Sequence, residues 1–149
     1  QRHGAVFTKV LHLHISVSRD GNAARRFCRR VAVNGLIGGH LLNQRLLELP
    51  VPAATRAAIK DGHRQGKTIE ELDPLISERL IGESGIVIAG TPAECVGQLD
   101  EVLRLAKSYR FDMVDMASPL GPDWNEAIDI FCQEILPELE RRSTAYVEN

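Results

Sequence analysis

Two histidines separated by one residue, His12 and His14, are the first side chains in this sequence that could carry chemistry. They lie in the stretch Val6–Ser18, where apolar residues take the odd positions from 11 to 17 and His or Ser takes the even ones. This alternation predicts a β-strand with one apolar and one polar face, so both imidazoles project from the same face. Three roles are open to them: a metal site, a hydrogen-bonded pair lining a barrel lumen, or a direct catalytic or cofactor contact.

The metal role needs further His or carboxylate ligands from other strand ends. The turns that follow the later strands offer only Glu94 and Asp123, and both are predicted to cap helices. We therefore expect no metal and favour the hydrogen-bonded pair. His14, nearer the C-terminal end of its strand, is the better candidate for a cofactor contact. Asp115 lies among apolar residues of a later strand, so it needs a hydrogen bond or an ion pair.

The elements that must position these residues are clearest between Gly85 and Pro137, where two strand–helix units follow each other. Strands are predicted over Gly85–Ala89 and Phe111–Ala117, and each is followed by a turn rich in Gly, Pro, Ser or Thr. Capping boxes predict the helix starts; they are Thr91 with Glu94 and Asp123 with Glu126. Two such units imply parallel strands joined by crossovers.

Apolar spacing predicts which face of each helix is buried. For the helices of these two units the predicted faces are Val96, Leu99, Val102, Leu103 and Ala106, and Ile128, Phe131, Cys132, Ile135 and Leu136. A further helix, from Asp20 to about Gly35, follows the histidine strand, with Ala24, Phe27, Cys28 and Val31 facing inward. Trp124, at a helix start, is expected to pack rather than to stack on a ligand.

Residues His40–Ser84 contain no strand candidate and are predicted to be a helical insertion. Its helical pieces are expected at Leu41–Leu47, Ala53–Lys60 and Glu70–Leu80, with a capping box from Thr68 to Glu71. Insertions of this kind often carry substrate contacts or a lid.

Charge and cysteine content restrict the partners and the setting of the chain. The net charge is −2, but eight of the basic residues and a single acid, Asp20, lie in the first 45 residues. Four of those arginines (Arg25, Arg26, Arg29 and Arg30) are predicted to form a solvated helix face, because no aromatic platform for nucleic acid accompanies them. No apolar run reaches membrane-spanning length. The three cysteines are expected to be buried reduced thiols, which favours a cytoplasmic setting.

Three segments together resemble one known family: IAGTPAECVGQLDEV, FDMVDMASPLGPD and NEAIDIFCQEILPEL. They are similar to the C-terminal end of the bacterial luciferase-like flavin and deazaflavin oxidoreductases, in particular to the methylenetetrahydromethanopterin reductase-like branch that uses coenzyme F420. The earlier segment HISVSRDGNAARRFCRRVA resembles the family's strand and Arg-rich helix. The chain departs from the family at Ser108–Phe111, where family members commonly have a glycine at the helix end.

The resemblance implies a TIM (β/α)₈ barrel, of which this chain would supply about the last three strand–helix units. Val6–Ser18, Gly85–Ala89 and Phe111–Ala117 would then be the sixth, seventh and eighth strands. The chain would be a single C-terminal part, divided into a strand–helix unit (1–39), the insertion (40–84), two closing units (85–137) and a tail (138–149). Barrel sites lie at the C-terminal ends of the strands, where backbone N–H groups often bind phosphate. The cofactor-binding residues expected on this basis are Gly90, Thr91, Ser118, Gly121 and His14.

The expected function is therefore hydride transfer between coenzyme F420 and a small organic substrate, with an FMN-dependent monooxygenase as the alternative within the same fold. Catalytic residues are not identified, and a fragment of this size is expected to be inactive alone. A non-catalytic α/β module that associates through open sheet edges is the alternative of another class. The expected partners are a flavin-type cofactor, a small-molecule substrate, and a second copy of the chain or the missing N-terminal part of the barrel. Neither nucleic acid nor membrane is expected.

Overall fold

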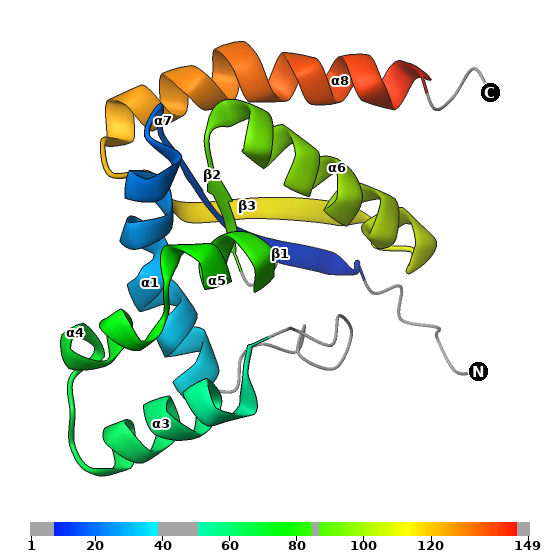
Figure 1. The fold of residues 1–149 in the computed structure, drawn as a ribbon. Coiled ribbons are helices and arrows are strands. Elements are labelled where there is room, and N and C mark those ends of the chain that lie inside the picture. Colours follow the sequence, from blue (N-terminus) through cyan, green and yellow to red (C-terminus); the bar gives the residue numbers. More distant parts are fainter. Residues whose placement is uncertain (1–7, 39–50, 85–86, 146–149) are drawn as a thin grey trace, which may run out of the picture.

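The computed structural model describes residues 8–38, 51–84 and 87–145 and shows an α/β fold with a three-stranded parallel sheet (Figure 1). The strands are β1 (Val10–Val17), β2 (Ile88–Gly90) and β3 (Met113–Leu120). Each lies within or close to a predicted strand, so the parallel α/β class is confirmed. Residues 85 and 86, part of the second predicted strand, lie outside the described residues.

Helices fill the connections between the strands. Those with described bounds are α1 (Gly21–Gly38), α3 (Ala53–Arg64), α4 (Ile69–Leu72), α5 (Glu78–Ser84), α6 (Pro92–Ser108), α7 (Trp124–Ile130) and α8 (Leu136–Ala145). A 3₁₀ turn, Asp73–Leu75, lies between α4 and α5, and a π-helical turn, Phe131–Ile135, joins α7 to α8. The expected insertion is helical wherever it is described; its predicted piece Leu41–Leu47 lies outside the described residues.

The order of the strands differs from the prediction. Three consecutive barrel strands would follow each other in chain order, whereas the sheet has the order β2-β1-β3, with β1 in the middle. Because β2 is only three residues long, it pairs with no more of β1 than Ile15–Val17. β3 pairs with the other edge of β1 from Val10 onward. The strand order therefore differs from the one expected for three consecutive barrel strands, and what the structure shows is a partial, barrel-like α/β arrangement.

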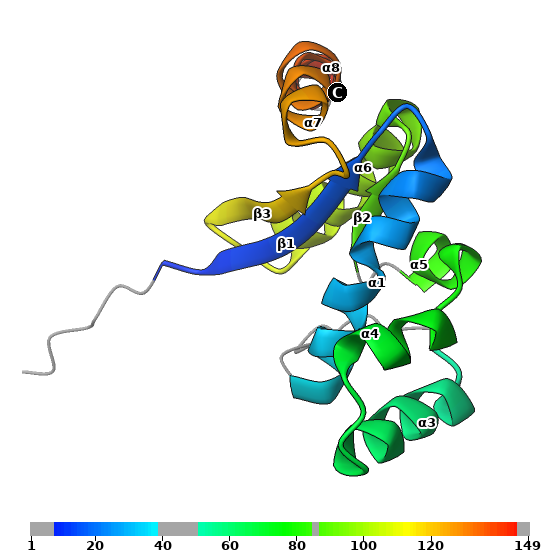
Figure 2. The ribbon, with the colours of Figure 1, turned by 90° about the vertical axis from the view of Figure 1, so that its left-hand side faces the viewer.

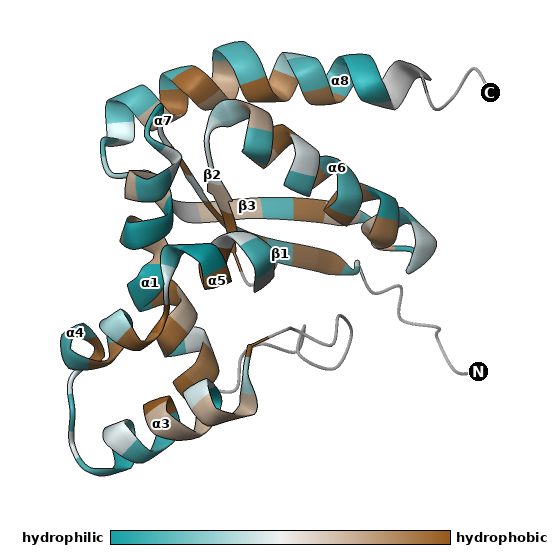
Figure 3. Cartoon of the chain, in the orientation of Figure 1, coloured by the Kyte–Doolittle hydropathy of each residue, from teal (hydrophilic) through white to brown (hydrophobic). Residues whose placement is uncertain are grey.

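Two separate hydrophobic clusters hold the elements together. One joins the sheet to α6, α7 and α8; its fully buried members include Ile15, Val17, Leu99 and Ile135. The other joins α1 to the insertion and β2; it includes Cys28, Leu36, Ile59, Leu72 and Ala89. The C-terminal half of α1 is accordingly mostly hydrophobic (Figure 3). As the element after β1, α1 connects the sheet to the insertion.

The sheet face that carries Val10, His12, Met113 and Asp115 is uncovered over the N-terminal halves of β1 and β3. In parallel register, Val10 lies beside Met113 and His12 beside Asp115, and all four side chains are exposed. In Figure 2, α7 and α8 lie on one side of these strands and none of the described helices covers the other. Parallel sheets are normally covered on both faces. The predicted division into an apolar and a polar face is confirmed for this part of β1.

Several predicted inward residues are exposed instead. Phe27 of α1 is 44% exposed, and Ile128, Cys132 and Leu136 of the last helices are also exposed, as is Trp124. The π turn between α7 and α8 changes the register of the buried face, because its extra residue rotates the helix that follows by about 100° relative to α7. The buried face is therefore Ala127, Ile130, Ile135 and Leu139. For α6 the predicted face is confirmed: Val96, Leu99 and Ala106 are buried, and Val102 and Leu103 pack against them.

Helix α6 ends in a Schellman motif built without glycine. The backbone N–H of Phe111 donates to the carbonyl of Ala106 at 3.0 Å, and that of Arg110 donates to the carbonyl of Lys107 at 3.1 Å. Arg110 has a φ of 56°, in the left-handed region. A residue with a Cβ is strained there by about 1–2 kcal/mol. The helix thus ends with the usual hydrogen bonds of this motif although Arg110 replaces the expected glycine.

Replacing Arg110 by glycine is expected to stabilise the protein by about 0.5–1 kcal/mol, because the strain of a left-handed side-chain-bearing residue is removed. Urea denaturation followed by circular dichroism measures the change. Ser108→Gly, two residues earlier and within the helix, is the matched control and should destabilise by about 0.5–1 kcal/mol. A destabilised Arg110→Gly protein would contradict the strain argument.

Candidate functional site

The turns after the three strands meet at one edge of the sheet. The backbone N–H of Ser18, just after β1, donates to the carbonyl oxygen of Gly90 at 3.2 Å. Gly121, just after β3, is buried against the end of β1, where a Cβ would collide with the carbonyl oxygen of Val17. The C-terminal edge of the sheet is therefore the place where the predicted turn residues come together, as parallel strands require.

The helix N-termini at this edge are capped by the chain's own side chains. Asp20 Oδ1 accepts from the backbone N–H groups of Asn22 and Ala23 at 2.9 and 3.2 Å. Asp123 Oδ1 accepts from Glu126 N at 3.0 Å at the start of α7. The predicted Thr91 box at α6 is present in full. Because these caps occupy backbone donors that a phosphate would use, the turns offer less for anion binding than the sequence suggests.

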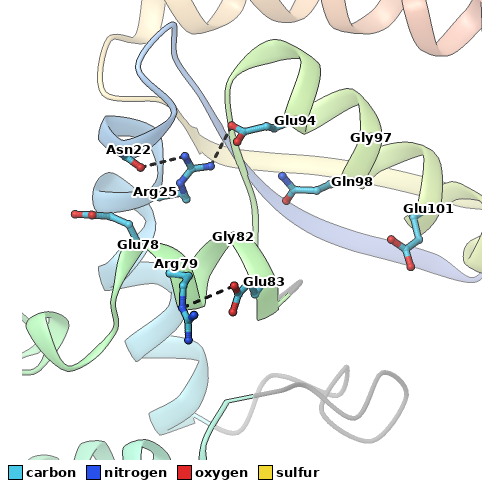
Figure 4. Close-up of a pocket in the computed structure, with 10 residues that line it drawn as sticks. All are labelled: Asn22, Arg25, Glu78, Arg79, Gly82, Glu83, Glu94, Gly97, Gln98 and Glu101. Carbon is cyan, nitrogen blue, oxygen red and sulfur yellow. Dashed lines mark hydrogen bonds and ion pairs between the residues drawn. The ribbon is translucent and has the colours of Figure 1, made fainter.

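Glu94 is the centre of the contacts at the start of α6. Its Oε2 accepts from the backbone N–H of Thr91 at 2.7 Å and from Arg25 Nη1 at 3.0 Å. The Thr91 N–H, followed by Arg25, holds the pKa of the Glu94 carboxyl below its usual range. Arg25 also donates to Asn22 Oδ1 at 3.1 Å, and its side chain is only 16% exposed. The Arg25–Glu94 pair thus ties α1 to α6 (Figure 4).

A cavity of about 590 Å³ opens beside this pair, between α1, α5 and α6 (Figure 4). Its lining is mostly charged, and the charged residues are Arg25, Glu78, Arg79, Glu83, Glu94 and Glu101. Several of these already pair with protein groups: Arg79 with Glu83 at 3.7 Å, and Glu78 with Arg29 of α1 at 2.8 Å. The cavity therefore contains charges of both signs that largely compensate each other.

One side chain of α6 covers the outer edge of β2. The Gln98 amide accepts from the backbone N–H of Ala89 and donates to its carbonyl oxygen, both at 3.2 Å. These are the two bonds that a further strand would make with Ala89. The edge of β2 is thus closed at this residue, whereas the prediction treated both sheet edges as open.

The two histidines form part of a polar cluster on the uncovered sheet face. His12 Nδ1 lies 2.8 Å from Asp115 Oδ2 on the neighbouring strand, and the rings of His12 and His14 meet edge to face with centroids 5.3 Å apart. The hydrogen bond predicted for His12 is present, with Asp115 as its partner, but it lies on an exposed sheet face. Asp115, expected among apolar residues, is itself exposed. Among the described residues there is no group of three His, Cys, Asp or Glu side chains that could hold a metal.

The five predicted site residues fall into two places. Gly90, Thr91 and Gly121 lie at the C-terminal edge, whereas His14 lies three residues before the end of β1, about 10 Å away. Ser118 was predicted to begin a turn, but β3 continues to Leu120, so its backbone belongs to the strand. The strand pairing becomes irregular next to it, between His14 and Ser16. These residues therefore do not form one compact group.

Local sequence patterns do not reveal the roles of Arg25 and Gln98. The spacing along α1 places Arg25 with the solvated arginines, because spacing within one helix cannot show that β2 and α6 pack beside it.

Two of the three cysteines are buried, as predicted. They are Cys28 and Cys95, and burial raises the pKa of each thiol to about 12. Cys132 is exposed, which contradicts the prediction for that residue.

No family model matches the sequence, and no curated protein matches it. Among the described residues, no helix combines the length and apolar character that crossing a membrane requires.

The solved structure of the coenzyme F420 dependent tetrahydromethanopterin reductase from Methanopyrus kandleri is similar to this chain, with a TM-score of 0.68 and 23% sequence identity. The match covers 87% of this chain and 35% of the reductase, so the chain spans about a third of the length of that protein. At this level of identity the likeness shows a shared fold: the described α/β arrangement corresponds to part of the reductase.

Proposed function

We propose that the chain is the C-terminal part of a luciferase-like oxidoreductase that binds coenzyme F420 and serves hydride transfer to or from a small organic substrate. The observation that supports this most is the fold shared over 87% of the chain with an enzyme described as F420 dependent. The division into a strand–helix unit, a helical insertion, two closing units and a tail belongs to the same proposal.

The residues of this chain fit a wall of a cofactor site better than a phosphate cradle. His14 and Ala117 lie side by side on the partly uncovered sheet face, where a planar ring could contact them. Thr91 lies at the start of α6, where its hydroxyl oxygen accepts from the backbone N–H of Glu94 at 3.4 Å. The cofactor site would receive only backbone groups from Gly90, Ser118 and Gly121. When bound, F420 supplies the hydride chemistry, and the protein supplies position and electrostatics.

A titration with F420, followed by its fluorescence, tests the proposal. We expect saturable binding by the chain and a loss of about tenfold in affinity for His14→Gln, since removal of one good polar contact costs about 1.4 kcal/mol. His12→Gln is the matched control: it lies on the same face but pairs with Asp115, and it should bind as the parent does.

The same titration is repeated with FMN. Tighter binding of FMN than of F420 would favour the alternative, an FMN-dependent monooxygenase of this fold. If neither cofactor binds at high micromolar concentration, the cofactor role of this chain is excluded.

A non-catalytic module that associates with a second copy is the alternative of another class. The observation in its favour is the uncovered face of a parallel sheet around Val10 and Met113. Light scattering after size exclusion separates the two proposals when it is combined with the titration. A dimer that binds no cofactor supports the module, and a cofactor-binding chain of either size supports the enzyme part.

A further inference from the structure

A groove of about 780 Å³ runs along α1 on the side away from the Arg25–Glu94 pair. It is bordered by α1, by the 3₁₀ turn before α5, and by the turn after β3. The residues that line it are Ala23, Arg26, Phe27, Arg29, Arg30, Val31, Asp73 and Pro122. The groove therefore combines three guanidinium groups, one carboxylate and an aromatic ring.

The helical repeat explains this combination. Ala23, Arg26, Phe27 and Arg30 follow the spacing i, i+3, i+4, i+7, which places them along one face of α1. Phe27 is 44% exposed between the two arginines, although apolar spacing predicted an inward position. An aromatic side chain exposed between cations offers a stacking surface next to positive charge.

The three arginines are satisfied to different degrees. Arg29 Nη2 donates to Glu78 Oε1 at 2.8 Å, and Arg30 pairs with Glu70 at 3.2 Å and with Asp73 at 3.7 Å. The ion pairs of Arg26 with Asp20 and Glu78 are both 3.6 Å long, beyond hydrogen-bonding distance. Arg29 Nε is buried and has no hydrogen-bond partner among the described residues. Arg26 thus keeps guanidinium donors available in the groove although acidic side chains lie nearby.

We propose that this groove binds a small organic phosphate that carries a planar ring, with the ring on Phe27 and the phosphate between Arg26 and Arg30. Guanidinium groups bind phosphate oxygens in pairs of parallel hydrogen bonds, which a dianion strengthens. A neutral ring compound would leave the arginines unused, and inorganic phosphate would leave Phe27 unused. The inference goes beyond the proposed function, because it concerns the outer face of α1 and needs no redox cofactor.

Naphthyl phosphate is a suitable probe, followed by NMR of the backbone amides and of the arginine Nε–H groups. We expect saturable shifts at Arg26, Phe27 and Arg30 and at the Arg29 Nε–H. Inorganic phosphate and naphthol, titrated separately, should each bind at least about tenfold more weakly, because each lacks one of the two contacts. Equal binding of naphthol, or shifts spread evenly over all arginines, would overturn the proposal.

Two exposed substitutions test the contacts without removing buried groups. Arg26→Gln and Phe27→Leu should each weaken naphthyl phosphate binding by about five- to tenfold. Arg79→Gln is the matched control, because Arg79 is a highly exposed helical arginine outside this groove, and its affinity should be unchanged. Unchanged binding by both groove variants would overturn the assignment. Failure of the F420 titration would leave it untouched, since the probe contains no cofactor.

Discussion

Gly121→Ala is expected to destabilise the protein by about 1–3 kcal/mol or more, because the added methyl group has no space. A Cβ at this position would overlap the carbonyl oxygen of Val17 and lie 2.9 Å from Ala127 Cβ. Both neighbours belong to backbone or to a Cβ, so neither can rotate away. Relief requires the turn after β3 to move away from the end of β1, which disturbs the edge where all three strands end. Urea denaturation followed by circular dichroism measures the loss.

Gly97→Ala is the matched control for this substitution. Gly97 lies within α6 and a Cβ there meets nothing within 4 Å. Alanine should therefore stabilise the helix by about 0.5–1 kcal/mol, since glycine costs backbone entropy. If the two substitutions gave the same sign and size of change, the collision at Gly121 would not be the cause.

Local signals in the sequence predicted local structure well. The capping boxes at Thr68 and Thr91 are present with both reciprocal hydrogen bonds, and α3 and α6 begin where the prediction places their starts. These features depend on residues three or four positions apart, which the sequence displays directly.

Features that depend on distant packing were predicted less well. β1 lies between β2 and β3, and no local pattern in the sequence gives this strand order. A single helical repeat cannot describe the buried face of α7 and α8, because the π turn between Ile128 and Leu136 changes its register. The error in the helix face comes from applying a regular period across an irregular element.

The candidate site shows the same limit. The turns at Gly90–Thr91 and Gly121 do meet at one edge, as parallel strands demand, but their helix N-termini are already capped. The arginines of α1 were expected to be solvated, and instead Arg25 is mostly covered by α6 and α5 while Arg29 pairs with Glu78. Charge complementarity between segments that are distant in the sequence decides these contacts, and spacing within one helix cannot reveal it.

Ile15→Ala is expected to cost about 2–5 kcal/mol, the largest effect of any single substitution considered for this chain. Ile15 is fully buried in the C-terminal half of the middle strand, in the cluster that joins the sheet to α6, α7 and α8. Both edges of β1 are paired around it, by β2 on one side and β3 on the other, so the backbone cannot collapse into the cavity. The unfolding midpoint in urea should fall without a change in the slope of the transition.

Val10→Ala provides the comparison on the same strand, because Val10 is exposed on the uncovered face and its truncation should cost less than about 1 kcal/mol. The two variants also test whether the uncovered face of the sheet is exposed to solvent when the protein is in solution. If Val10→Ala were as costly as Ile15→Ala, the uncovered face would be buried in solution, against a second copy or another polypeptide. Light scattering at the same concentration would then decide between these two, since only a second copy doubles the mass.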